Sequence, residues 1–387
     1  MLQRQDLVPS ASSSPPRPPP AIPVLSFFTG LGFLDLGFQQ AGFTVLWSNE
    51  LNPWFASGRD FGTRSLLGNQ SQAHPSNLES ITTLGPNQIA KEAFNGTSKP
   101  PVFGIIGGPP CPDFSVGGKN RGGQGDHGKL SQVYVNRILE LEPTFFLLEN
   151  VPGILRTRKH AAFFKRLREQ LATKFTLSHR ILNALDFGVP QDRDRVFLVG
   201  FNNRWFKRKV EKPLLPEVED WFPWPRDARY AGAKSRFPWP EVCPIGTTPE
   251  KPANIPDELM VGPQICDPNA IRSLPNGTEG FRPRSKKFKT IEEGDDSRKS
   301  FKRLHRWRYS PTAAYGNNEV HLHPVEPRRI TVREALRIQS VPDTFALPVD
   351  MPLSHKFKGI GNGVPVRLAN AMARAIETFL RDAGNGS

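Results

Sequence analysis

Short apolar runs alternate with segments of helical periodicity through the first half of the chain. The runs are bounded by glycine, proline or polar residues, which is typical of buried strands. They cover residues 24–28, 44–48, 102–106, 144–148 and 196–200. Helices are predicted over 34–41, 130–141 and 163–171, with an extended segment near 178–182. This alternation predicts an α/β fold built on an open sheet.

The pattern changes twice along the chain. Between 205 and 315 prolines recur every few residues and the alternation of strands and helices stops. Regular patterning resumes at 329, where Thr331 and Glu334 form a capping box, and a helix is predicted over 366–380. We therefore expect a Pro/Ser-rich leader at 1–21, a first domain at 22–205, an inserted loop-rich domain at 206–325, and a segment at 326–387 that returns to the first domain. The leader has no apolar core, so it is predicted to be disordered and not a signal peptide.

Residues 58–99 are polar, rich in Asn, Ser, Thr and Gly, and carry only a weak helical signal. A short strand near Ile81 is the one regular element considered in this stretch.

Composition narrows the class of partner. Among 387 residues, 51 Lys and Arg face 37 Asp and Glu, which gives a net charge of +14. Such an excess favours a polyanion, most simply nucleic acid, although a positively charged enzyme without such a partner remains an alternative. Three cysteines without a CxxC pair predict neither a zinc site nor a disulfide scaffold, and free thiols suit the cytoplasm. No apolar run is long enough to cross a membrane.

A glycine turn follows the first predicted strand. Gly30 and Gly32 let the backbone approach a ligand closely, and Glu50 ends the second strand, where an acid can bind ribose hydroxyls. These features predict a site for a nucleoside cofactor, against the alternative of a plain turn and an exposed acid. Asp35 stands where a dinucleotide fingerprint needs a third glycine, so NAD is disfavoured.

Cys111 lies on a proline-rich loop directly after the strand at 102–106. Proline restricts the backbone, so the thiol is presented on a stiff mount, as a nucleophile requires. The alternative is a cysteine that serves as a small buried hydrophobe. Glu149 ends the next strand and is a candidate acid–base group. Arg193 and Arg195 alternate on an extended segment, which predicts two guanidinium groups on one face, suited to an anion or a polarised carbonyl.

Basic residues lie in two further places. The glycine-rich loop after Cys111 can close over a substrate and contact phosphates, and the insert mixes basic with aromatic residues, which suits phosphate contact and stacking. Solvated surface charge is the competing interpretation. The predicted DNA contacts are Ser115, Lys119, Arg121, Arg284, Lys286, Lys287 and Arg306.

Taken together, these motifs resemble the DNA cytosine-C5 methyltransferases, particularly the bacterial modification enzymes of restriction systems. Seven short motifs occur in the order of that family, with a long insert at the position of its target-recognition domain. They are 28–32, 49–50, 109–111, 149–151, 191–195, 329–343 and 361–363.

The resemblance implies an S-adenosylmethionine-dependent methyltransferase fold of Rossmann-like type and a role for each matching residue. Cys111 would attack C6 of a cytosine flipped out of double-stranded DNA, Glu149 would hold or protonate N3, and Arg195 with Arg193 would contact O2 and the catalytic loop. The residues implied to bind S-adenosylmethionine are Phe28, Gly30, Gly32, Glu50, Ile81, Pro109 and Asn362. A monomer that is paired with a restriction endonuclease is implied as well.

The chain departs from the family pattern at a few positions. Pro112 replaces the glutamine that is usual after the cysteine, and Ser26 and Phe33 stand where Asp and Gly are common. No acidic adenine contact is evident near Ile81. A transfer-RNA methyltransferase, a catalytically inactive DNA-binding protein and a cysteine hydrolase are the alternatives. The long insert disfavours the first, the intact chemical residues the second, and the lack of a histidine that the sequence pairs with Cys111 the third.

Overall fold

The computed structural model describes residues 21–68, 74–110, 126–209, 221–283, 285–298, 300–315 and 319–385. Cys111, Ser115, Lys119, Arg121 and Arg284 lie outside these residues, as do Pro112 and the leader up to residue 20.

Six strands of the described chain form one sheet in the order β2-β1-β3-β4-β6-β5. The strands are β1 (Ile22–Phe27), β2 (Phe43–Asn49), β3 (Gly104–Gly107), β4 (Phe145–Asn150), β5 (Phe175–Asn183) and β6 (Asp194–Asn202). The first four run parallel to one another, and β6 is antiparallel to both of its neighbours. Each of the five predicted apolar runs is confirmed as a strand.

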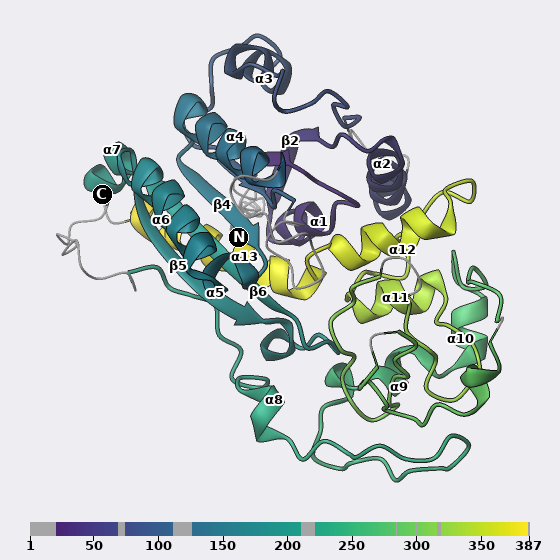
Figure 1. Cartoon of the computed structure of the whole chain (residues 1–387). Coiled ribbons are helices and arrows are strands. Elements are labelled where there is room, and N and C mark those ends of the chain that lie inside the picture. Colours follow the sequence, from purple (N-terminus) through teal and green to yellow (C-terminus); the bar gives the residue numbers. More distant parts are fainter. Residues whose placement is uncertain are drawn as a thin grey trace, which may run out of the picture.

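Helices cover both faces of the sheet (Figure 1). Successive side chains of a strand point to opposite faces, so Phe146 and Leu148 pack on one side and Phe145 and Leu147 on the other. The first side is covered by α3 (Pro86–Ala93), α4 (Asp126–Leu141), α5 (Gly153–Arg156) and α6 (Arg158–Ala172). The second is covered by α1 (Phe33–Gln40) and α13 (Val366–Asn385), and α7 (Asn203–Lys209) contributes Phe206. The helices predicted over 34–41, 130–141, 163–171 and 366–380 are confirmed as α1, α4, α6 and α13.

The weak helical signal of residues 58–99 understates the helix found there. The last part of helix α2 (Pro53–Leu67) reaches into the stretch, α3 lies within it, and Ile81 sits in a turn and not in the strand that was considered. Asn52 caps α2 by accepting hydrogen bonds from two backbone amides of its first turn. The glycines that weaken its helical signal are contact points, because a Cβ at Gly58 would lie 2.7 Å from Leu31 and one at Gly62 would lie 2.1 Å from Phe345.

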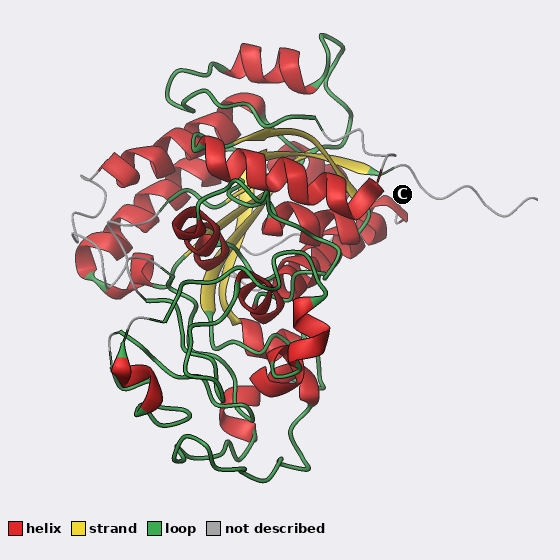
Figure 2. Ribbon diagram, turned by 90° about the vertical axis from the view of Figure 1, so that its right-hand side faces the viewer, coloured by secondary structure: helices red, strands yellow, loops and turns green. Residues whose placement is uncertain are grey.

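The insert is loop-rich, as expected, and Figures 1 and 2 show it as connected loops with short helices to one side of the sheet. Its helices are α8 (Ala233–Arg236), α9 (Val261–Ile265) and α10 (Pro268–Arg272). Trp221, Phe222 and Trp224, near the start of the predicted insert, pack instead against the sheet face that α13 covers.

The chain then enters α11 (Val332–Ile338), whose predicted capping box between Thr331 and Glu334 is confirmed. Helix α12 (Leu353–Asn362) comes next and was not predicted. A separate apolar cluster joins α11 and α12 to Leu31 and Phe33 beside the glycine turn. No helix in the described residues is long and apolar enough to span a membrane.

Candidate active site

The candidate site lies at the carboxyl edge of the parallel strands. Phe27 pairs with Asn49 on one neighbour and with Gly107 on the other, and Gly107 pairs with Leu148. The segments after these four strand ends are therefore brought to one edge of the sheet, where open α/β sheets bind their ligands. They carry the glycine turn, Glu50 and the loop toward Cys111, and Glu149, the last residue but one of β4, lies at the same edge.

Glu50 joins the first two of these segments. One carboxylate oxygen accepts a 2.9 Å hydrogen bond from the amide of Gly30, and the other accepts one of 2.9 Å from the amide of Asn52. Burial raises the pKa of Glu50, and the two amides partly oppose that rise. Each oxygen keeps a lone pair that can accept a further hydrogen bond, such as one from a ribose hydroxyl.

The turn itself has an unusual backbone that suits a ligand. Gly30 and Gly32 have φ values of 56° and 79°, and Phe28, a residue with a Cβ, has a φ of 55°. A non-glycine residue held at positive φ is strained, and such strain clusters at ligand sites. The Phe28 ring meets Tyr134 edge to face at 5.9 Å between centroids. With Glu50, this cradle fits S-adenosylmethionine.

A buried ion pair between Asp35 and Arg59 packs against the glycine turn, and the sequence did not predict it. Asp35 is 3 % exposed, accepts a hydrogen bond from the hydroxyl of Ser26, and pairs with Arg59 at 3.3 Å. The Arg59 stem lies so close under Gly32 that a Cβ there would be 2.6 Å away. Asp35 thus occupies the interior where a dinucleotide fold has glycine. A lone acid on the apolar helix 34–41 was the available signal.

The other predicted cofactor residues are less directly placed. Ile81 is 3 % exposed and belongs to the core beneath the sheet edge, Pro109 is buried, and Asn362 is exposed at the end of α12. Gly363 packs the segment after Asn362 against Phe33, because a Cβ there would lie 2.4 Å from the ring. The segment 361–363 is therefore adjacent to the glycine turn. No contact with a ligand tests these assignments, which stay predictions.

Glu149 and Arg195 form the charged centre of the site. The carboxylate of Glu149, from β4, lies 2.8 Å from Nε of Arg195 on β6. The two residues are 9 % and 8 % exposed. Burial raises the pKa of Glu149, and the charges of Arg195 and then Arg193 act in the opposite direction. A buried carboxyl with a raised pKa beside one cation is suited to hold a proton and pass it to a base.

Gly108 places this carboxyl against the loop that carries Cys111. A Cβ on Gly108 would lie 2.6 Å from Oε2 of Glu149, so the backbone three positions before Cys111 touches the carboxylate. The sequence predicted Cys111 and Glu149 at the ends of two strands. The structure brings Glu149 into contact with Gly108, at the start of the loop toward Cys111.

We expect Gly108→Ala to lower kcat by about tenfold or more, because an added methyl displaces Glu149 and small misplacements in active sites are costly. Gly85→Ala is the matched control: Gly85 has ordinary backbone angles and no atom within 4 Å of a built Cβ. Initial rates of methyl incorporation into duplex DNA measure the effect. Equal rates for the two variants would contradict the assigned contact.

Arg193 differs from its neighbour Arg195. It is 1 % exposed, and its guanidinium donates to the backbone carbonyls of Gly361 at 2.8 Å and Gly363 at 3.0 Å. It also donates at 3.3 Å to the carbonyl of Ala313. These terminal donors are therefore directed at protein carbonyls, in contrast to the arrangement expected for contact with a base.

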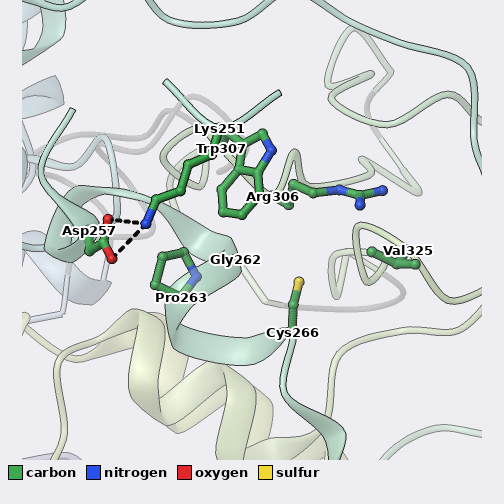
Figure 3. Close-up of a pocket in the computed structure, with 8 residues that line it drawn as sticks. All are labelled: Lys251, Asp257, Gly262, Pro263, Cys266, Arg306, Trp307 and Val325. Atoms are coloured by element: carbon green, nitrogen blue, oxygen red, sulfur yellow. Dashed lines mark hydrogen bonds and ion pairs between the residues drawn. The ribbon is translucent and has the colours of Figure 1, made fainter. Parts of the chain in front are cut away.

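The predicted DNA contacts in the insert fall into two kinds. Lys286 and Lys287 are exposed on one helical turn, so their ammonium groups face solvent. Arg306 instead pairs with the buried Glu293, at 2.9 Å from Nε and 2.7 Å from Nη2. Figure 3 shows Arg306 at the wall of a pocket of about 500 Å³ with Trp307 and with Lys251, which is paired with Asp257. The lining residues of this pocket all come from the insert, and include neither Glu50 nor Glu149.

Sheet, glycine turn and Glu50 together define an S-adenosylmethionine-dependent methyltransferase. Within that class the chain belongs to the C-5 cytosine-specific DNA methylase family, whose model matches residues 22–378. It is 43 % identical over 366 residues to the type II methyltransferase M.NmeDI of Neisseria meningitidis serogroup C, covering 93 % of this chain and 84 % of the relative. It is 32 % identical over 369 residues to M.MthTI of Methanothermobacter thermautotrophicus, covering 92 % and 97 %.

Solved structures agree in fold. A DNA modification methyltransferase encoded within a prophage of E. coli matches with a TM-score of 0.57 at 22 % identity, over 93 % of this chain and all of the other. The Dnmt2 methyltransferase of S. pombe matches with a TM-score of 0.55 at 13 % identity, over 94 % and 99 %. The predicted family, fold class and cofactor are confirmed. Membership of this family favours a cytosine-C5 DNA methyltransferase over the alternatives.

Proposed function

We propose that this chain methylates C5 of one cytosine within a short sequence of double-stranded DNA and thereby protects that sequence from a paired restriction endonuclease. The observation that carries the proposal is the buried Glu149–Arg195 pair, at 2.8 Å, in contact with the loop that leads to Cys111 and at the same sheet edge as Glu50. We further propose that the enzyme acts as a monomer in the cytoplasm. The insert would read the surrounding bases, with phosphate contacts from Lys286 and Lys287.

Cytosine C5 is a poor nucleophile, so the reaction needs covalent activation. The thiolate of Cys111 would add to C6, and the electrons of the C5–C6 double bond would move toward N3 and O2. Glu149 would deliver its proton to N3, which leaves a neutral enamine with a nucleophilic C5. Arg195 would hold O2 and keep Glu149 in place. S-adenosylmethionine, when bound, supplies the methyl group to C5 as an electrophilic carbon.

The remaining steps restore the ring. Once C5 carries the new substituent, water would remove the C5 proton, the C5–C6 double bond would form again, and the C6–S bond would break to release the thiolate, while N3 returns its proton to Glu149. Phe28, Gly30, Gly32 and Glu50 would hold the nucleoside part of the cofactor, and Asn362 its amino-acid end. Ile81 and Pro109 would line the same site. A base stacked in a duplex cannot reach this edge, so the cytosine must be flipped out.

Bisulfite sequencing of DNA from cells that express the chain, beside cells that express Cys111→Ser, tests the proposal. Cytosines protected in one short recurring motif, and only with the unaltered chain, would support it and reveal the target. No protected cytosine in either DNA sample would contradict it, and protection confined to RNA from the same cells would favour the transfer-RNA alternative.

We expect binding to a duplex to weaken steeply with salt, because each neutralised phosphate releases counterions. With about four phosphate contacts, the binding constant should fall roughly 150-fold between 50 and 200 mM salt. Lys286→Ala and Lys287→Ala should each make the log–log slope shallower by about 1, measured by fluorescence anisotropy. Lys165→Ala, an exposed lysine on α6, is the control and should leave the slope unchanged. A flat salt response of the unaltered chain would contradict the assignment.

A further inference from the structure

The side chain of Arg193 lies where three parts of the chain meet. Its Nη2 bonds to the carbonyls of Gly361 and Gly363, on either side of Asn362. Its Nη1 bonds to the carbonyl of Ala313, at the end of the insert, at 3.3 Å. The residue itself stands directly before β6, two positions before Arg195. A single guanidinium therefore joins the proposed cofactor segment, the insert and the catalytic strand.

Gln191 extends this junction. Its side-chain oxygen accepts hydrogen bonds from Nη1 of Arg193 at 3.4 Å and from the amide of Ala313 at 3.1 Å. Its amide group donates at 3.3 Å to Gln339, whose own amide donates to the carbonyl of Ile360 at 2.6 Å. Both glutamines are completely buried. The two glutamines thus tie the last turn of α12 to the same point.

The backbones at this junction are in direct contact. A Cβ on Gly361 would lie 2.8 Å from the amide of Tyr315 and 3.0 Å from the carbonyl of Ala313. Only glycine allows the insert to approach the segment 361–363 this closely. On the other side, Gly363 packs against Phe33 next to the glycine turn. A shift of Arg193 would therefore move the segment that carries Asn362.

We infer that Arg193 is a positioning residue, which holds the segment 361–363 in the geometry that binds the amino-acid end of S-adenosylmethionine while the insert is docked. This inference rests on the proposed function, since it assigns a role within the same site. It gives Arg193 a task different from that of Arg195. Four hydrogen bonds to three backbone carbonyls and Gln191 use the terminal nitrogens of Arg193, so Arg195 is the one of the two arginines that contacts cytosine.

The chain supplies a matched control for the cost of altering such a residue. Arg303 is 1 % exposed, like Arg193, and its guanidinium also donates to backbone carbonyls, including those of Ile291 at 2.8 Å and Glu326 at 3.0 Å. All of these partners lie in the insert and the segment after it, away from the glycine turn. Arg193→Lys and Arg303→Lys therefore remove the same kind of buried clamp at two different places.

Calorimetric titration with S-adenosylhomocysteine, which carries the same amino-acid end, reads out binding without turnover. We expect Arg193→Lys to weaken its Kd about tenfold and to raise the KM for S-adenosylmethionine alike, as expected for the loss of one positioned contact. The KM for DNA should change less than twofold. Both Arg193→Lys and Arg303→Lys should lower the melting temperature. Arg303→Lys, however, should leave the Kd for S-adenosylhomocysteine within twofold of the unaltered chain.

Several outcomes would overturn the inference. An unchanged Kd for S-adenosylhomocysteine in Arg193→Lys would mean that Arg193 contributes only to the stability of the fold. Equally weakened binding of S-adenosylhomocysteine in Arg193→Lys and Arg303→Lys would mean the same. A raised KM for DNA with an unchanged Kd for S-adenosylhomocysteine would make Arg193 a contact to the base. Should Arg193→Lys not fold, Gly361→Ala, which forces the same two segments apart, should weaken S-adenosylhomocysteine binding in its place, and unchanged binding there would overturn the inference too.

The same titration separates this inference from the proposed function. If the unaltered chain did not bind S-adenosylhomocysteine at all, the proposed cofactor site would fail and the positioning role with it. If the unaltered chain bound and Arg193→Lys bound equally well, only the positioning role would fail.

Discussion

Replacing Cys111 with serine is expected to lower methyl transfer to DNA by more than about a thousandfold, because the nucleophile is then lost. A cysteine is a few per cent thiolate at neutral pH, whereas a serine hydroxyl stays protonated there. Without addition to C6, C5 does not become nucleophilic, and the residual rate falls toward that of cytosine in solution. Incorporation of a labelled methyl group into a duplex that contains the target sequence measures the loss.

Two controls identify the loss as chemical. Cys111→Ser should bind the same duplex with unchanged affinity, since one oxygen replaces one sulfur. With S-adenosylmethionine present, a duplex with 5-fluorocytosine at the target should form a complex with the unaltered chain that survives denaturing gel electrophoresis, because after methyl transfer fluorine cannot leave C5 as a cation and the C6–S bond is retained. No such complex should form with Cys111→Ser. Methylation by Cys111→Ser at more than about a tenth of the original rate would contradict nucleophilic catalysis by this residue.

Glu149→Gln is the second large effect, with an expected loss in kcat of about 10²- to 10⁴-fold, the range typical of a general acid. Glutamine keeps the shape of the side chain and an oxygen for Arg195, but it carries no transferable acidic proton. Gly108 and the loop toward Cys111 should keep their places, so the KM for DNA is expected to stay within about threefold. Single-turnover rates measured with excess enzyme isolate this chemical effect from product release.

The pH dependence of kcat gives the Glu149 prediction a direction. Burial raises the pKa of Glu149, so the protonated form that serves as acid persists to a higher pH than in an ordinary glutamate and is lost as pH rises through that pKa. The chain should therefore show a descending limb on the alkaline side of that pKa, and Glu149→Gln should lack it. Arg195→Gln removes the cation that lowers the pKa of Glu149, so the descending limb should move to higher pH. A limb that stays in place in Glu149→Gln would assign it to another group.

The ends of the strands were predictable because the apolar runs are short and end at chemically distinct residues. A buried strand needs several consecutive apolar side chains, and the residue after its last position, at the sheet edge, is free to be polar. Glu50 and Glu149 were found in this way, and the structure places both at that edge. Helix α2, by contrast, was not predicted, because its local sequence pattern is not that of a helix. Its glycines lower the helical signal, and they are favoured only because Leu31 and Phe345 pack against them from distant parts of the chain.

Arg193 and Arg195 show the same limit at the site. Their alternation indicated two similar guanidinium groups, yet one pairs with Glu149 and the other bonds to carbonyls of residues 313, 361 and 363. Spacing along one strand gives the direction of a side chain, whereas its partner depends on which backbone arrives opposite it. Those carbonyls are more than a hundred residues away in the chain, so no local pattern encodes them.

By itself, the sequence determined the α/β fold, the order of its motifs, the family and the residue types that the chemistry requires. These depend on local hydrophobic periodicity and on functional groups at strand ends, which short segments contain in full. The tertiary structure alone decided that Glu149 lies against Gly108, three positions before Cys111, that Asp35 and Arg59 support the glycine turn, and that Arg193 joins the insert to the segment around Asn362. Each of these depends on contacts between segments far apart in the chain, and such contacts are defined only when the whole core is packed.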